Sequence, residues 1–216
     1  ADLDAAVSGA IACKFRNAGQ TCVCANRFYV QAGVYDEFVS RLAERARAAK
    51  VGNGFEPGVE IGPLINEAAL QKVQQHVDDA LAKGGRLLCG GVSDGLFITP
   101  AVIADAAAEM AVSREEIFGP LAPLFRFHTE EEAVALANDT EYGLAAYFYS
   151  RDIGRITRVS EALEYGMAAV NTGALSNAAA PFGGVKQSGM GREGSRYGMD
   201  EYLEMKYIVT AGITAA

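Results

Sequence analysis

Apolar positions along the chain alternate between helical spacing and short continuous runs. Between residues 35 and 50, Phe38, Leu42 and Ala46 recur every four positions, which predicts an amphipathic helix. Asn66 is a favourable N-cap for a second helix that runs to Lys83, before two glycines. Two more helices are predicted, one that starts at Thr129 and one at residues 153–163. Apolar runs predict buried strands at residues 87–89, 97–102, 121–127, 145–149 and 167–170.

This alternation of helix and strand predicts an α/β fold with a largely parallel sheet flanked by helices. Residues 51–62 are rich in glycine and predict a loop. Beyond Ser195 the pattern changes, because a β-prone run at residues 202–210 follows the last glycine cluster. From the pattern alone, this run would be the final strand of the same sheet.

Composition excludes several classes of protein. Half of the 216 residues are hydrophobic and 21% are charged, as in an ordinary globular enzyme with a substantial core. The net charge of -8 argues against a nucleic-acid or acidic-membrane partner, and no apolar run approaches the roughly 20 residues of a membrane span. The acidic start lacks the features of a signal peptide, and four cysteines make no disulfide framework, so we expect a cytoplasmic protein.

The candidate nucleophile is Cys22, in the segment Gly19-Gln20-Thr21-Cys22-Val23-Cys24. The only histidines, His76 and His128, lie in a polar helical stretch and at the end of an apolar run. A papain-type thiol–imidazole pair is therefore not expected. The alternative is that Cys22 is a small buried hydrophobe, the usual fate of a free cysteine. No metal site is expected, because the Cys-x-Cys pair has no second ligand pair.

Three segments of the chain carry recognisable motifs: residues 14–27 around Cys22, the segment Glu115-Glu116-Ile117-Phe118-Gly119-Pro120, and the glycine-rich segment 181–193. Together they resemble the aldehyde dehydrogenase superfamily. They follow one another in the family order at family-like spacing. The first is most similar to the active-site strand of the succinate-semialdehyde dehydrogenase branch. The resemblance covers nearly the whole chain and implies the fold of the family's catalytic domain.

The resemblance implies roles for the substrate side of the site. Cys22 would add to the aldehyde carbonyl, and its backbone N–H would help to hold the developing oxyanion. Arg16 would grip the far carboxylate of the substrate through two parallel hydrogen bonds, helped by Ser176, and Phe182 would line the pocket. A surface ion pair is the alternative for Arg16.

The same resemblance implies a nicotinamide cofactor, NADP or NAD. Glu116 would accept hydrogen bonds from the hydroxyls of the nicotinamide ribose, and Phe118 would pack near the ring. A solvated acidic helix end is the alternative for Glu116. Cys24 is a redox-switch candidate or an inert thiol; in an extended segment it would point to the same face as Cys22.

The expected organisation is a catalytic domain at residues 1–195 and a C-terminal oligomerisation arm at residues 196–216. The resemblance places the dinucleotide-binding domain, and the glutamate that acts as general base, before residue 1. We expect the catalytic domain of an NAD(P)-dependent succinate-semialdehyde dehydrogenase that oxidises succinic semialdehyde to succinate as a homo-oligomer. The alternatives are a glutarate-semialdehyde or broad-range aldehyde dehydrogenase, or an inactive assembly module.

Overall fold

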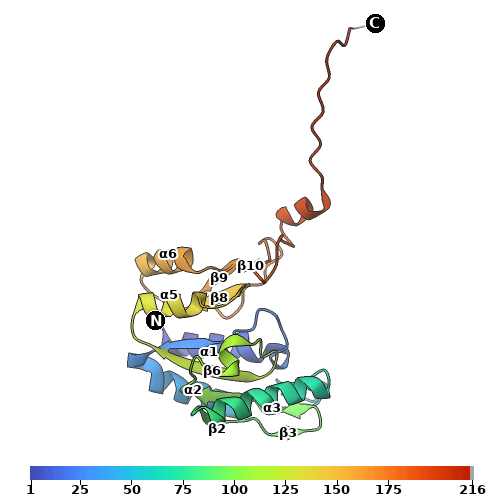
Figure 1. Ribbon diagram of the computed structural model, residues 1–216. Coiled ribbons are helices and arrows are strands. Elements are labelled where there is room, and N and C mark those ends of the chain that lie inside the picture. Colours follow the sequence, from blue (N-terminus) through green and yellow to red (C-terminus); the bar gives the residue numbers. More distant parts are fainter. Residues whose placement is uncertain (215–216) are drawn as a thin grey trace.

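A four-stranded sheet forms the centre of the larger part of the molecule in the computed structural model, which describes residues 1–214 (Figure 1). Its strand order is β1 (Phe28–Gln31), β6 (Leu121–Phe127), β5 (Ala101–Ala104) and β2 (Arg86–Cys89). β6 runs parallel to both β1 and β5, whereas β2 is antiparallel to β5. Every residue of β5 is fully buried, so both faces of the sheet are covered. The predicted α/β fold with a largely parallel sheet is confirmed.

Four helices belong to this part of the chain: α1 (Leu3–Phe15), α2 (Tyr35–Ala48), α3 (Glu67–Ala82) and α4 (Ala111–Arg114). α2 packs against α1 and the sheet, while α3 packs against β2 and α4. Phe38, Leu42 and Ala46 are all buried, as their helical spacing predicts. Asn66 caps α3 by accepting a hydrogen bond from the Ala69 N–H at 2.9 Å.

A second, smaller layer contains the parallel pair β8 (Ala145–Phe148) and β9 (Met167–Val170) with helices α5 (Glu130–Asn138) and α6 (Ile153–Ala162). Figure 1 shows this layer stacked over the four-stranded sheet. The remaining elements are short: β3 (Ser93–Asp94), β4 (Phe97–Ile98), β7 (Tyr142–Gly143), β10 (Val185–Lys186), and the 3-10 turns η1 (Arg16–Gly19), η2 (Ala32–Val34) and η3 (Tyr197–Tyr202).

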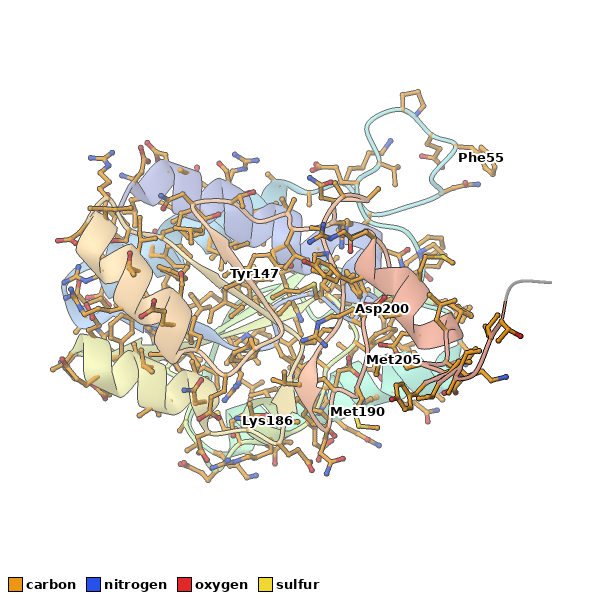
Figure 2. All side chains as sticks on the ribbon, turned by 90° about the horizontal axis from the view of Figure 1, so that it is seen from above. Phe55, Tyr147, Lys186, Met190, Asp200 and Met205 are labelled. Carbon is orange, nitrogen blue, oxygen red and sulfur yellow. The ribbon has the colours of Figure 1, made fainter. Side chains whose placement is uncertain are left out.

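The C-terminal tail differs from the sequence-based expectation. Residues 203–214 are exposed and contain no strand or helix, and they extend away from the rest of the chain (Figure 1). Their large apolar side chains are more than 60% exposed; Met205, labelled in Figure 2, and Tyr207 are at least nine-tenths exposed. The alternative that residues 202–210 form the final strand of the same sheet is therefore wrong, and the oligomerisation arm stays a prediction. Residues 215–216 of the predicted arm lie outside the described residues.

Three further predictions need correction. The run at residues 97–102 divides into β4 and β5, because Pro100 has no N–H to donate to a ladder. Helix α1 and strand β1 were not predicted, although Asp2 caps α1 through the Ala5 N–H at 3.1 Å. The segment 14–27, which resembles the active-site strand of the family, is not extended but contains the end of α1, the η1 turn and a loop.

Candidate active site

The segment between α1 and β1, residues 16–27, is hereafter the nucleophile loop. After Arg16, three successive residues have positive φ values: Asn17 at 53°, Ala18 at 55° and Gly19 at 74°. The left-handed conformation costs an L-residue such as Ala18 about 1–2 kcal/mol. Gly19 is required by packing as well, since a Cβ there would lie 2.2 Å from the Gly119 carbonyl oxygen. This close contact joins the nucleophile loop to the segment 115–120, which contains Glu116 and Phe118.

Cys22 lies in a turn that the Cys24 N–H closes by donating to the Thr21 carbonyl at 2.9 Å. The turn leaves Cys22 exposed and Cys24 half-buried, with both thiols free. The two side chains would share a face only in an extended segment, and the turn shows that the segment is not extended. Exposure also contradicts the alternative that Cys22 is a buried hydrophobe. Among residues 1–214 the Cys22 N–H has no hydrogen-bond acceptor, so it is free to donate to a ligand.

Neighbouring elements hold the nucleophile loop at Val23 and Ala25. Tyr147 of β8, labelled in Figure 2, donates its hydroxyl to the Val23 carbonyl at 2.9 Å. The Ala25 N–H donates to the Cys13 Sγ at 3.3 Å. Burial raises the pKa of both the Tyr147 hydroxyl and the Cys13 thiol, so both stay protonated. They fix the loop without carrying charge.

Arg16 follows the last residue of α1 and is exposed. In the described part of the chain no carboxylate pairs with its guanidinium, so the surface ion pair that is the alternative for Arg16 does not form among residues 1–214. The Cys24 thiol contacts the Arg16 carbonyl at 3.9 Å, a weak interaction that brings the two residues to the same end of the loop. The exposed, unpaired guanidinium is free to donate two parallel hydrogen bonds to a carboxylate.

Lys14 is a buried charged residue next to the nucleophile loop that the sequence motifs do not single out. It lies at the end of α1, only 1% exposed, on the same helical face as the buried Val7 and Ala10. Burial lowers its pKa to about 8, and the nearby Cys24, Cys13 and Glu116 only partly offset that shift. A lysine at a core position of the helical pattern was the signal that could have found it.

Glu116 and Phe118 follow α4, and both are exposed. Phe118 has a φ of 50°, which is strained for an aromatic residue. Within residues 1–214 the Glu116 carboxylate has no hydrogen-bond or ion-pair partner. A free carboxylate beside an exposed ring fits the diol and ring of a nicotinamide riboside. The solvated helix end, the other interpretation of Glu116, is compatible with the same exposure.

Asn26, also missed, ties the two segments together. Its Nδ2–H donates to the Glu115 carbonyl at 2.7 Å, and its Oδ1 accepts from the Ile117 N–H at 2.9 Å. The local sequence carries no signal for this contact, because the partners are about 90 positions away.

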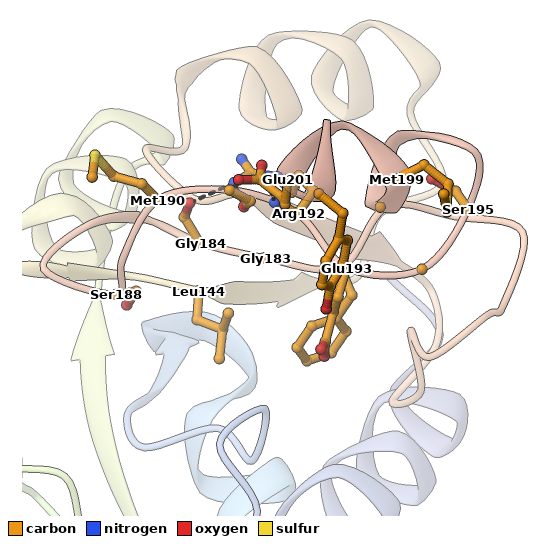
Figure 3. Close-up of a pocket in the computed structure, with 15 residues that line it drawn as sticks. Leu144, Gly183, Gly184, Ser188, Met190, Arg192, Glu193, Ser195, Met199 and Glu201 are labelled. Carbon is orange, nitrogen blue, oxygen red and sulfur yellow. Dashed lines mark hydrogen bonds between the residues drawn. The ribbon is translucent and has the colours of Figure 1, made fainter. Parts of the chain in front are cut away.

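Ser176 and Phe182 share one open hollow of about 480 Å³, which Asn177, Ala178, Ala180, Glu193 and Gly194 also line. Phe182 lies in a larger hollow of about 590 Å³ as well, at the foot of the tail (Figure 3). There Arg192 donates to the carbonyls of Gly184 and Gly191, both at 2.7 Å. Neither hollow includes Cys22 or Arg16 among its lining residues, so neither by itself is the site of the chemistry.

The described residues lack two features, a metal-binding cluster and a membrane span. Residues 1–214 contain no group of three or more histidine, cysteine or carboxylate side chains that could hold a metal ion. No helix in that range combines the length and apolarity of a membrane span.

Comparison with known proteins shows strong similarity along the chain. The model of the aldehyde dehydrogenase family matches residues 1–208. A 3-sulfolactaldehyde dehydrogenase of Pseudomonas putida is 61% identical over 99% of this chain, and a succinate-semialdehyde dehydrogenase [NADP(+)] of Escherichia coli is 59% identical over 96%. A glutarate-semialdehyde dehydrogenase of Pseudomonas putida is 58% identical over 96%. In each case the chain covers 44% of the relative.

The fold is similar to solved structures as well. The crystal structure of a succinate-semialdehyde dehydrogenase from Burkholderia pseudomallei superposes with a TM-score of 0.92 and 63% identity, over 94% of this chain and 42% of that one. The chain thus spans less than half the length of the relatives it matches. With the family model matching nearly every residue, the chain belongs to the aldehyde dehydrogenase family.

Proposed function

We propose that this chain is the catalytic part of an NAD(P)-dependent dehydrogenase that oxidises succinic semialdehyde to succinate. The observation that carries the proposal is the nucleophile loop, which presents Cys22 on an exposed turn six residues after an unpaired Arg16. The relatives of similar identity are named for 3-sulfolactaldehyde, succinate semialdehyde and glutarate semialdehyde. Each of these aldehydes carries an anionic group away from the reacting carbon, which a guanidinium can bind.

The proposed reaction has two stages. The Cys22 thiolate forms a bond to the aldehyde carbon, and the carbonyl oxygen becomes an oxyanion that accepts a hydrogen bond from the free Cys22 N–H. NAD or NADP supplies the acceptor for the hydride that this carbon loses, leaving a thioester on Cys22. Water then cleaves the C–S bond, releasing the carboxylate product and the thiol. Glu116 binds the ribose hydroxyls and Phe118 packs near the nicotinamide ring.

Arg16 is proposed as the clamp for the far carboxylate, with Ser176 and Phe182 on the wall of the substrate pocket. The reach of this clamp separates the candidate substrates, since glutaric semialdehyde is one methylene longer than succinic semialdehyde. A methylene changes the transition-state energy by about 1–3 kcal/mol in a fitted pocket. Glutaric semialdehyde therefore remains the second candidate, supported by the relative that carries its name.

The test uses a full-length enzyme that carries this chain and compares kcat/KM for succinic semialdehyde and butanal, which has four carbons but no carboxylate. Losing a charge-assisted bidentate contact costs about 3 kcal/mol, so Arg16→Ala should reduce succinic semialdehyde oxidation about 100-fold. Butanal oxidation should change by less than about threefold, because no carboxylate contact is lost. Arg41→Ala is the matched control, since Arg41 only forms surface ion pairs with Asp4 and Glu37. An equal loss for both aldehydes would refute the clamp.

The C-terminal arm and the thiol pair are separate proposals. The exposed apolar side chains of the tail would pair with a second copy of the chain, forming a homo-oligomer. Oxidation by hydrogen peroxide would remove two electrons and two protons from the Cys22 and Cys24 thiols and reduce the peroxide to two waters, and the strained, reducible disulfide so formed would switch the enzyme off. Both proposals assign a partner to groups that are exposed or free in the single chain.

A further inference from the structure

We propose that Asn26 is a positioning residue for the dinucleotide site, because its amide joins the nucleophile loop to the backbone on both sides of Glu116. This inference rests on the proposed function and adds to it a residue that sets the spacing between the nucleophile and the ribose-binding carboxylate. Its proposed role is to position Glu116, not to react.

The two hydrogen bonds determine the orientation of the amide. Its Nδ2–H donates to the Glu115 carbonyl at 2.7 Å, and its Oδ1 accepts from the Ile117 N–H at 2.9 Å. A flipped amide would place acceptor against acceptor and donor against donor, so only one orientation satisfies both partners. The bonded groups are the immediate backbone neighbours of Glu116. Asn26 thus fixes the direction in which Glu116 leaves the chain.

Other contacts anchor the same short segment. The His76 Nε2 lies 3.2 Å from the Glu115 carboxylate, and the Ile117 side chain is 1% exposed. Gly19 also lies against Gly119, since a Cβ at Gly19 would be 2.2 Å from the Gly119 carbonyl oxygen. Between these anchors the Glu116 side chain is exposed, and no side chain of residues 1–214 pairs with its carboxylate. A carboxylate held by its backbone and left unpaired is preorganised for a ligand.

On the other side, Asn26 is four residues from Cys22. The intervening Val23 and Ala25 are held by Tyr147 at 2.9 Å and by Cys13 at 3.3 Å. Cys22 is therefore connected to Glu116 through the loop backbone, which these contacts hold at Val23 and Ala25, and through the Asn26 amide. Small errors in the distance between reacting groups cost large factors in rate, so this path bears directly on hydride transfer.

A merely structural tie would lower stability and leave ligand affinity unchanged, and a matched control separates the two roles. Asn138 makes the same kind of clamp elsewhere: its Nδ2–H donates to the Ala162 carbonyl at 2.8 Å, and its Oδ1 accepts from the Glu164 N–H at 2.9 Å. Asn138→Ala should therefore cost similar stability without moving Glu116.

The experiment uses the full-length enzyme with Asn26→Leu, Asn26→Ala and Asn138→Ala. Three quantities are measured: the Kd of NAD or NADP by calorimetry, the alkylation rate of Cys22 by iodoacetamide, and the melting temperature. Loss of two hydrogen bonds should raise the dinucleotide Kd about tenfold in both Asn26 variants. The alkylation rate should stay within about twofold, because Tyr147 and Cys13 still hold the turn. Asn138→Ala should leave the Kd unchanged.

An unchanged Kd in folded Asn26→Ala, or an equal rise in Asn138→Ala, would overturn the inference. The Ala variant is the milder of the two and guards against misfolding of the Leu variant. Failure of the proposed function looks different: the wild type would bind dinucleotide and lose affinity on Asn26 substitution but oxidise no aldehyde. A wild type that binds no dinucleotide would overturn both.

Discussion

Lys14 provides the sharpest test of the packing beneath the nucleophile loop. The lysine is 1% exposed at the end of α1, and burial lowers its pKa from 10.5 to about 8. Each pKa unit corresponds to 1.36 kcal/mol, so holding the ammonium in the fold at pH 7 costs about 3 kcal/mol relative to water. This is a large fraction of the stability of a typical domain.

The sign of the pH dependence follows from proton counting. Between pH 8 and 10.5 the unfolded lysine keeps its proton while the folded one has lost it, so the unfolded state binds more protons. Stability contributed by Lys14 therefore rises with pH across this window, by about 3 kcal/mol in total. Lys14→Met keeps the length of the side chain and removes the titration, so the variant should be up to about 3 kcal/mol more stable than wild type at pH 7.

The assay is urea unfolding of the chain at pH 7, 8, 9 and 10, with wild type and Lys14→Met compared at each pH. Other groups titrate in this range in both proteins, so the difference between the two isolates Lys14. The advantage of the variant should shrink as pH rises. Lys50→Met is the control, because Lys50 is exposed and forms a surface pair with Glu56. A constant difference between wild type and Lys14→Met across the series would refute the buried-ammonium argument.

Two further predictions concern His76 and the C-terminal tail. Burial lowers the pKa of His76 below 6.5, so the unfolded state takes up a proton first and stability falls as pH decreases below about 6.5. In urea titrations at pH 7.5 and 5.5, His76→Gln should therefore lose less stability on acidification than the wild type. Equal losses in the two proteins would contradict this. Deleting residues 202–216 from the full-length enzyme should reduce its assembly size in sedimentation velocity, because the contact of the exposed apolar tail with a second copy would be lost. An unchanged size would exclude the arm.

Much of the fold was predictable, because its longer elements are locally encoded. The amphipathic period of α2, the Asn66 cap of α3 and the apolar run of β6 each depend on neighbours within a few positions. Helix α1 was missed because alanine and glycine dominate its sequence and weaken the periodic contrast. The tail shows the limit of β-propensity: a β-prone run forms a strand only when an edge is available to pair with it.

The sequence by itself determined which chemical groups are present and where they stand in the family motifs: Cys22, Arg16, Glu116 and Phe118. Only the tertiary structure decided how they are presented. The left-handed turn before Cys22, the burial of Lys14 and the Asn26 clamp all depend on contacts with elements distant in the chain. Such contacts form when the core closes, and no local pattern of residues encodes the distance or direction at which two loops then meet.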